Sequence, residues 1–227
     1  MTRLRRDERG TTLAELMVGL GIGMVVMLGL TSLIVVTLHS STRVSARVDA
    51  TQRARLALNQ VLDQLHSACL VPKVAPILEK STGTELRFVH AAGSTVSPTP
   101  TLSVISFAEG AMKQTDYAWK EGAAPFWVFQ TTATKTTQLM DQITPVSASK
   151  PVFSYYASTG GGLGTPLATP LSTLDAIRTI QVSIVFKTAP QHGSAEEATP
   201  ARIQGGATMR LTAAPSYKQE VQSLPCQ

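Results

Sequence analysis

The chain has few cysteines, few aromatic residues and few charges, and each shortage excludes a class of protein. Its 227 residues include two cysteines, 5% aromatic residues and 15% charged residues. Two cysteines are far too few for a disulfide-rich scaffold. Disorder requires low hydrophobicity with high net charge, whereas 43% of this chain is hydrophobic and its formal net charge is +5. The composition therefore predicts one modest folded domain together with an apolar segment.

The excess of positive charge is small outside the N-terminus. Four arginines and two acidic residues fall within the first ten residues, which leaves 16 basic against 13 acidic residues in the remainder. Nucleic-acid-binding surfaces usually carry clusters of Lys and Arg interleaved with aromatic residues, and the sequence has no such cluster. We therefore expect no direct nucleic-acid binding.

Only one stretch is apolar enough to cross a membrane, which excludes a polytopic membrane protein. Residues 16–38 contain no charge, and a helix of that length can span a hydrocarbon core about 30 Å thick. A cleaved secretory signal has a shorter apolar core, of about 7–15 residues, with a small-residue cleavage site close behind it. The small residues at 44–46 lie well beyond the run and next to Arg43. The sequence thus favours one membrane pass.

The helical pattern continues beyond the apolar run. Residues 40–70 contain no Pro or Gly, and Pro72 and Pro76 then end the helix. Five apolar residues recur at three- and four-residue steps and share one helix face: Leu58, Val61, Leu62, Leu65 and Cys69. Packing against a domain explains this stripe better than a cofactor site or a coiled-coil seam. We predict one helix over residues 11–70, with a transmembrane part (11–38) and an amphipathic part (39–70).

The remaining residues, 77–227, predict a β-rich globular domain. All twelve Phe, Tyr and Trp residues lie between Phe88 and Tyr217. Apolar and polar residues alternate in several segments, which is typical of half-buried strands. The predicted strands are 85–89, 102–107, 126–130, 152–156, 180–186 and 207–211, and turn-rich stretches separate them at 91–100, 158–170 and 189–200. We expect an α+β fold in which the helical stripe covers a mainly antiparallel sheet.

Signals for catalysis are weak. The four histidines, His39, His66, His90 and His192, show no metal-ligand spacing with Cys, Asp or Glu. The glycine-rich stretch at 160–164 lacks the Gly-Lys-Ser/Thr ending of a phosphate-binding loop, so we expect a flexible loop there. No Gly-x-Ser-x-Gly motif is present, although a Ser-His-Asp arrangement assembled by the fold stays open. We expect no enzymatic activity, no metal and no cofactor.

The N-terminus carries the most specific motif. A basic leader, MTRLRRDERG, ends in Gly10, and the apolar segment TTLAELMVGLGIGMVVMLGL follows with Glu15 as the fifth residue after that glycine. This pattern resembles the signal of type IV pilins and type II secretion pseudopilins. The stretch LALNQVLDQLHSA and the late segments TIQVSIVFKTAP and ATMRLTAAP are similar to minor pilins of the PilW type and pseudopilins of the PulJ (GspJ) type. The resemblance implies a pilin-like lollipop.

The resemblance also implies a processing site. A membrane-embedded prepilin peptidase would remove residues 1–10 by cleaving between Gly10 and Thr11, and would commonly methylate the new amine of Thr11. Thr11 stands where Phe or Met is usual in these proteins. Cleavage turns a neutral amide into a cation close to Glu15 of the same or a neighbouring subunit. Such a pair in low dielectric offsets the cost of burying either charge, so Glu15 would fix the register of a subunit in a filament.

Charge counting leaves the membrane orientation open. Four arginines in the leader are balanced by Arg43, Arg47, Arg53 and Arg55 beyond the span. The resemblance implies an N-terminus in the cytoplasm, storage as a single-pass inner-membrane protein, and later an extracytoplasmic pilus or pseudopilus. In the oxidising space outside, Cys69 and Cys226 could form a disulfide, or both could stay free thiols.

Gly19 and Gly23 form a small-xxx-small pair that would allow close helix packing, although glycine is also simply tolerated in membrane helices. The expected function is that of a minor pilin or pseudopilin, with lipid, other pilins, the prepilin peptidase and an inner-membrane assembly platform as partners. The alternative is a single-pass membrane-anchored extracytoplasmic ligand-binding protein that does not polymerise. A third hypothesis is an exported hydrolase held by an uncleaved signal anchor.

Overall fold

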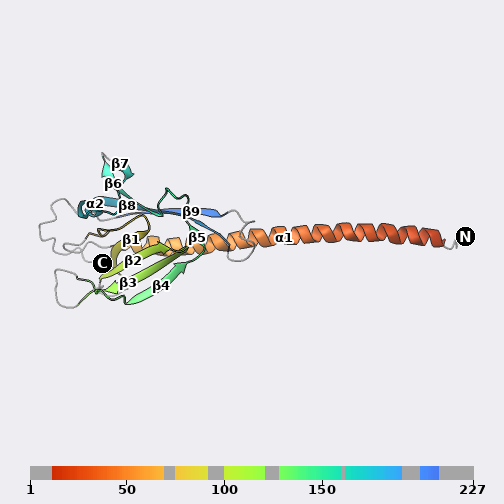
Figure 1. Ribbon diagram of the computed structural model, residues 1–227, viewed down its shortest axis with the longest axis horizontal. Helices are drawn as coiled ribbons and strands as arrows, with labels where there is room; N and C mark the ends of the chain where they lie inside the picture. The colour runs from red at the N-terminus through yellow and green to blue at the C-terminus, as the bar shows by residue number, and fades with distance from the viewer. Residues whose placement is uncertain are drawn as a thin grey trace, which may run out of the picture. The chain divides into compact units, whose positions relative to one another are not determined.

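The computed structural model describes residues 12–68, 75–91, 100–120, 128–159, 162–190 and 200–209. The chain divides into two compact units, the first ending at Ser45 and the second beginning at Ala46. Helix α1 (Leu13–His66) contributes to both, and every strand belongs to the second (Figure 1).

In the first unit, α1 is an exposed apolar helix. Every large hydrophobic side chain from Leu13 to Leu38 is at least 46% exposed. By length and composition this helix can cross a membrane. Its hydroxyl groups bond to carbonyl oxygens of the same helix, as Thr31 does to Met27 O and Thr37 to Leu33 O, both at 2.8 Å. The apolar stretch therefore satisfies these polar groups internally, which a hydrocarbon environment requires.

In the second unit, α1 is amphipathic, as predicted. The buried residues include the predicted Leu58, Val61 and Leu65, and burial begins earlier, at Ala50 and Ala54. Alanines gave little signal in the sequence because a methyl group is only weakly apolar and alanine is also favoured at exposed helix positions. The helix ends at His66, four residues before the predicted end at 70, and Ala68 then forms a β-bridge with His90.

Two antiparallel sheets follow, where one was predicted. The first has the order β1 (Glu85–Ala91), β2 (Pro100–Ala108), β3 (Ala111–Ala118) and β4 (Lys135–Met140). The second has the order β5 (Ile143–Thr144), β8 (Thr179–Thr188), β6 (Phe153–Thr159) and β7 (Gly162–Pro166), with β9 (Ala201–Thr208) also paired to β8. A short helix, α2 (Thr173–Arg178), leads into β8. The α+β layout is confirmed.

Several predicted strands need correction. Four predicted segments correspond to β1, β2, β6 and β8, but the prediction for 207–211 was wrong in its bounds, because β9 starts at Ala201 and Gly205 and Gly206 interrupt its alternation. Strands β3, β4, β5 and β7 were missed, and β7 occupies part of the glycine-rich stretch predicted as a flexible loop. Of 126–130, residues 126 and 127 lie outside the described part, and Phe129 forms a single bridge with Trp119.

One hydrophobic core joins α1 to both sheets. The helix contributes Ala54, Leu58, Val61 and Leu65. Buried side chains from the two sheets complete the same cluster: Leu86, Phe88, Ile105 and Met112 from the first sheet, and Phe153, Tyr155, Val182, Ile184, Phe186 and Ile203 from the second. The helix stripe is thus a structural part of the domain.

Carbonyl oxygens just before and at the start of β1 accept hydrogen bonds from β6 and so join the two sheets. The Tyr155 hydroxyl donates to the carbonyl oxygens of Thr82 and Glu85, both at 3.0 Å, and the Phe153 amide donates to Gly83 O at 3.0 Å. Burial raises the pKa of Tyr155 well above its usual value, so the phenol stays a neutral donor. A Cβ on Gly83 would lie 2.5 Å from Pro151 Cβ, so this junction requires glycine.

Replacing Gly83 by Ala should lower the free energy of unfolding by about 1–3 kcal/mol, because the rigid Pro151 ring cannot move away. Gly162→Ala is the matched control, since a Cβ there meets nothing within 4 Å. The measurement is urea unfolding of the full chain in mild detergent, followed by tryptophan fluorescence. Equal stability of the two variants would contradict the close approach.

The helix stripe gives a second prediction. Leu65→Ala should cost about 2–5 kcal/mol of unfolding free energy, because Leu65 is 1% exposed in the core. Leu56→Ala removes the same atoms from a residue that is 70% exposed, and should cost far less. A comparable loss in both variants, measured by the same unfolding experiment, would show that the helix is not packed through this face.

Candidate functional site

The first candidate site is the start of α1. The Thr12 amide donates to Glu15 Oε2 at 3.3 Å, and the Glu15 amide donates to Thr12 Oγ1 at 3.4 Å. This reciprocal pair is a capping box, in which a Thr and a Glu three residues later satisfy two free amides at a helix start. The sequence Thr-Leu-Ala-Glu already contained this signal, which the sequence analysis missed. Glu15 therefore has a local structural role in the isolated chain.

The Glu15 carboxylate can still accept a hydrogen bond from a further partner. Both of its bonds to Thr12 are long, and the residue is exposed in the first turn of α1. The N-terminus of a helix favours negative charge at this place. Gly10 and Thr11, the predicted cleavage and methylation residues, lie outside the described residues, so the pairing of Glu15 with a Thr11 amine stays a prediction.

The two predicted helix-packing residues, Gly19 and Gly23, have open surroundings. A Cβ on either would meet nothing within 4 Å. They lie four residues apart on the exposed apolar helix, so one bare strip of backbone is accessible to a helix from another molecule. Their proposed role in packing thus concerns other chains.

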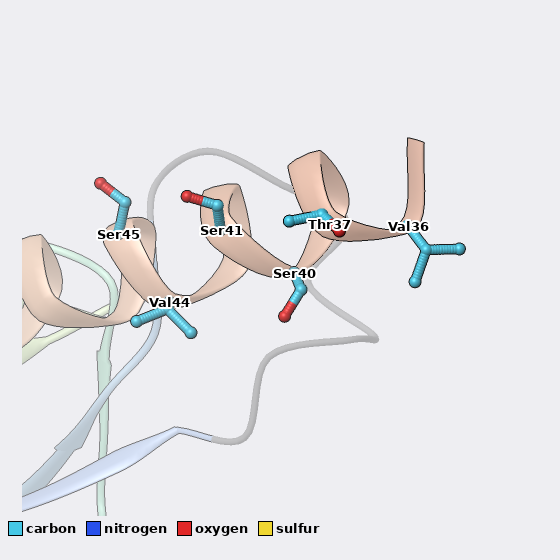
Figure 2. A pocket seen from close by; sticks show the side chains of 6 residues that line it. All are labelled: Val36, Thr37, Ser40, Ser41, Val44 and Ser45. Atoms are coloured by element: carbon cyan, nitrogen blue, oxygen red, sulfur yellow. The ribbon is translucent and has the colours of Figure 1, made fainter. Parts of the chain in front are cut away.

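A shallow depression lies farther along α1. It is lined by Val36, Thr37, Ser40, Ser41, Val44 and Ser45 (Figure 2). Figure 2 shows these side chains along one stretch of helix, with Ser41 and Ser45 pointing away from Ser40 and Val44. Ligand sites are usually concave and bury most of their ligand. A single helix surface provides no such enclosure, so we assign no ligand to this depression.

The second unit holds a buried polar cluster on β1, β2 and β3. The Ser103 hydroxyl donates to Asp116 Oδ1 at 2.6 Å, and His90 Nε2 lies 2.9 Å from Ser103 Oγ. Gln114 Nε2 donates to the same Asp116 oxygen at 2.8 Å. His90 and Gln114 are 5% exposed and Ser103 is fully buried. The sequence left open a Ser-His-Asp arrangement assembled by the fold. It did not identify these residues, because they are spread over three strands.

The order of groups in this cluster differs from that of a serine hydrolase. In a Ser-His-Asp triad the histidine lies between the other two and accepts the serine proton. Here Ser103 lies in the middle and gives its single proton to Asp116, so His90 Nε2 is the donor to Ser103 Oγ. A protonated Nε2 cannot accept a proton from that oxygen. The geometry therefore suits a network that holds three neighbouring strands together.

The other predicted site residues are dispersed. His39 and His66 are exposed on α1, whereas His192, Cys69 and Cys226 lie outside the described residues. Within the described ranges, no three His, Cys, Asp or Glu side chains lie close enough to hold a metal ion. The disulfide between Cys69 and Cys226 stays a prediction.

No protein-family model matches this chain, and a comparison with curated proteins gives no significant match.

The buried cluster gives a third prediction. Ser103→Ala should lower the unfolding free energy by about 1–3 kcal/mol, because it leaves buried polar groups of His90 and Asp116 without their shared partner. Ser106→Ala on the opposite face of β2 is the control, since Ser106 is only half-buried. Chemical unfolding of both variants measures the difference. If Ser103→Ala were as stable as the control, the cluster would not hold the strands.

Proposed function

We propose that this protein is a minor pilin or pseudopilin, processed between Gly10 and Thr11 and built into a type IV pilus or a type II secretion pseudopilus. The observation that carries the proposal is Glu15, a lone carboxylate at the start of an otherwise uncharged helical stretch. A carboxylate at the edge of an apolar segment is costly to bury without a cationic partner. Processing at Thr11 would supply that partner.

Cleavage changes the electrostatics at the start of α1. Before cleavage the nitrogen of Thr11 belongs to a neutral peptide bond, and after cleavage it is an ammonium four residues from Glu15. The capping bonds from Thr12 to Glu15 are long, so the carboxylate can accept a stronger charge-assisted bond from such an amine. In a low-dielectric bundle an unpaired Glu15 would be disfavoured, so pairing would select one register between subunits.

The apolar part of α1 suits both a lipid bilayer and a bundle of helices, which are the two locations that the proposal requires. Its side chains are exposed from Leu13 to Leu38, so lipid or the apolar helices of other subunits must cover them. The hydroxyls of Thr31, Ser32 and Thr37 are satisfied within the helix in either location. Gly19 and Gly23 offer a surface where a neighbouring helix could approach closely. Transfer from bilayer to filament then exchanges one apolar environment for another.

The second half of α1 would serve as the attachment of the domain. Leu58, Val61 and Leu65 are committed to the core of the second unit, so they are not available to a helix bundle. Assembly would thus depend mainly on the exposed apolar residues from Leu13 to Leu38. The partners of this process would be the prepilin peptidase, other pilins and an inner-membrane assembly platform, with the N-terminus starting in the cytoplasm.

The proposal is tested by the mass of the mature chain. In cells with an active prepilin peptidase the chain should begin at Thr11, with or without an added methyl group, and in cells without the peptidase it should begin at Met1. Intact mass and N-terminal sequencing distinguish these forms. A chain that begins at Met1 in both strains would contradict the proposal, and would favour the membrane-anchored protein that does not polymerise.

Glu15→Gln separates processing from assembly. The variant should still be cleaved after Gly10, but its amount in filaments should fall at least about tenfold. The Thr11 ammonium would then be buried without a counter-charge, which costs several kcal/mol. Asp63→Asn is the control, because it removes one negative charge from an exposed position of the same helix. Quantitative mass spectrometry of filament fractions measures both. Equal incorporation of the two variants would remove the register role from Glu15.

A further inference from the structure

The second sheet carries charge of only one sign. None of its strands, β5 to β9, contains an Asp or a Glu, and the charged residues in them are Lys187 on β8 and Arg202 on β9. The first sheet, in contrast, mixes both signs, with Glu85, Asp116 and three basic residues among its strands. The strands of the second sheet therefore provide no carboxylate that could neutralise Lys187 and Arg202.

The strand register places Lys187 and Arg202 directly opposite each other, with Thr144 of β5 on the other side of Lys187. Their neighbours along the strands, Phe186 and Ile203, are buried in the core. Because side chains alternate between the faces of a strand, both cations lie on the outer face of the sheet. Arg202 is exposed and Lys187 is half-buried.

Like charges that face each other across an antiparallel pair destabilise it, because their Cβ atoms are only about 4.5–5.5 Å apart. No carboxylate in the described part of the chain forms an ion pair with either cation. Arg202 Nη2 bonds instead to the neutral amide oxygen of Gln204 at 3.1 Å. An anion placed between the two side chains would turn this repulsion into attraction.

Most other residues of this face are polar and uncharged, although the apolar Val185 also lies on it, opposite Gln204. The register aligns Ser154 with Ser183 and Gly206, and Tyr156 with Gln181 and Thr208. Hydroxyl and amide groups of this kind donate and accept hydrogen bonds at the polar rims of protein interfaces. We call these residues, together with Thr144, Lys187, Arg202 and Gln204, the outer face of the second sheet.

We propose that the outer face of the second sheet docks a carboxylate-bearing segment of another polypeptide, with Lys187 and Arg202 holding its Asp or Glu side chains. DNA binding draws its affinity from many phosphate contacts made by Lys and Arg, and anionic membranes are recognised by clusters of about 4–8 basic residues. Two adjacent cations within hydroxyl and amide groups fit one or two carboxylates. This inference does not depend on whether α1 enters a filament.

The test titrates poly-L-glutamate against the full chain in uncharged detergent micelles at low salt. Lys187→Gln combined with Arg202→Gln should weaken binding about fivefold, the loss expected for two exposed ion pairs. Arg55→Gln combined with Lys113→Gln removes the same charge from α1 and from β3, and should change binding less than twofold. All three proteins keep the four leader arginines, so background attraction is the same.

A second readout needs no ligand. Lys187→Gln alone should raise the thermal midpoint by about 1–2 °C at low salt by relieving the repulsion, and the gain should vanish in about 1 M salt. A fall in the midpoint would assign Lys187 a structural role and overturn the proposal, as would equal poly-L-glutamate binding by the two double variants. Stronger, variant-sensitive binding of duplex DNA or of phosphatidylglycerol vesicles would overturn the choice of a polypeptide. Self-association of the wild type that the Lys187/Arg202 variant loses would overturn the choice of a different protein and assign the face to a second copy of this chain.

Discussion

The burial of one helix face against two sheets is the interaction on which the domain depends. Each sheet has an apolar face that needs a cover, and the stripe from Ala50 to Leu65 supplies it for both. Because the helix side chains are shared, neither sheet has a complete core without α1. The polar contacts around Tyr155 and Ser103 then fix the strands that this packing brings together.

The two parts of helix α1 differ in what surrounds their apolar side chains. Up to Leu38 its apolar side chains are exposed and its hydroxyls are satisfied internally, whereas from Ala50 its apolar face is buried in the domain. Charge is confined to the ends of the apolar stretch, with Glu15 before it and Arg43 after it. A helix of this kind can exchange lipid for other helices while the domain stays folded, which is the physical requirement for a membrane-stored filament subunit.

Sequence reasoning located the elements with strong apolar periodicity. It missed strands in which threonine or glycine takes the place of alternating apolar residues. The stripe at Leu58 to Leu65 and the alternation in β8 predicted their structures correctly. Strand β4 was missed because its threonines show no apolar alternation, and β7 because glycines normally indicate a loop. The His90, Ser103 and Asp116 cluster could not be predicted, since only the strand register brings these residues together. The capping box at Thr12 and Glu15 was visible in the sequence and was overlooked.

Entry of this chain into a filament through α1 would require the processed N-terminus to be found there. The most direct measurement compares membranes and isolated filaments from the same cells by quantitative mass spectrometry of the N-terminal peptide. A peptide that begins at Thr11 is expected in the filament fraction, and it should disappear from that fraction when the prepilin peptidase is removed. A chain found only in membranes, with Met1 intact, would contradict it.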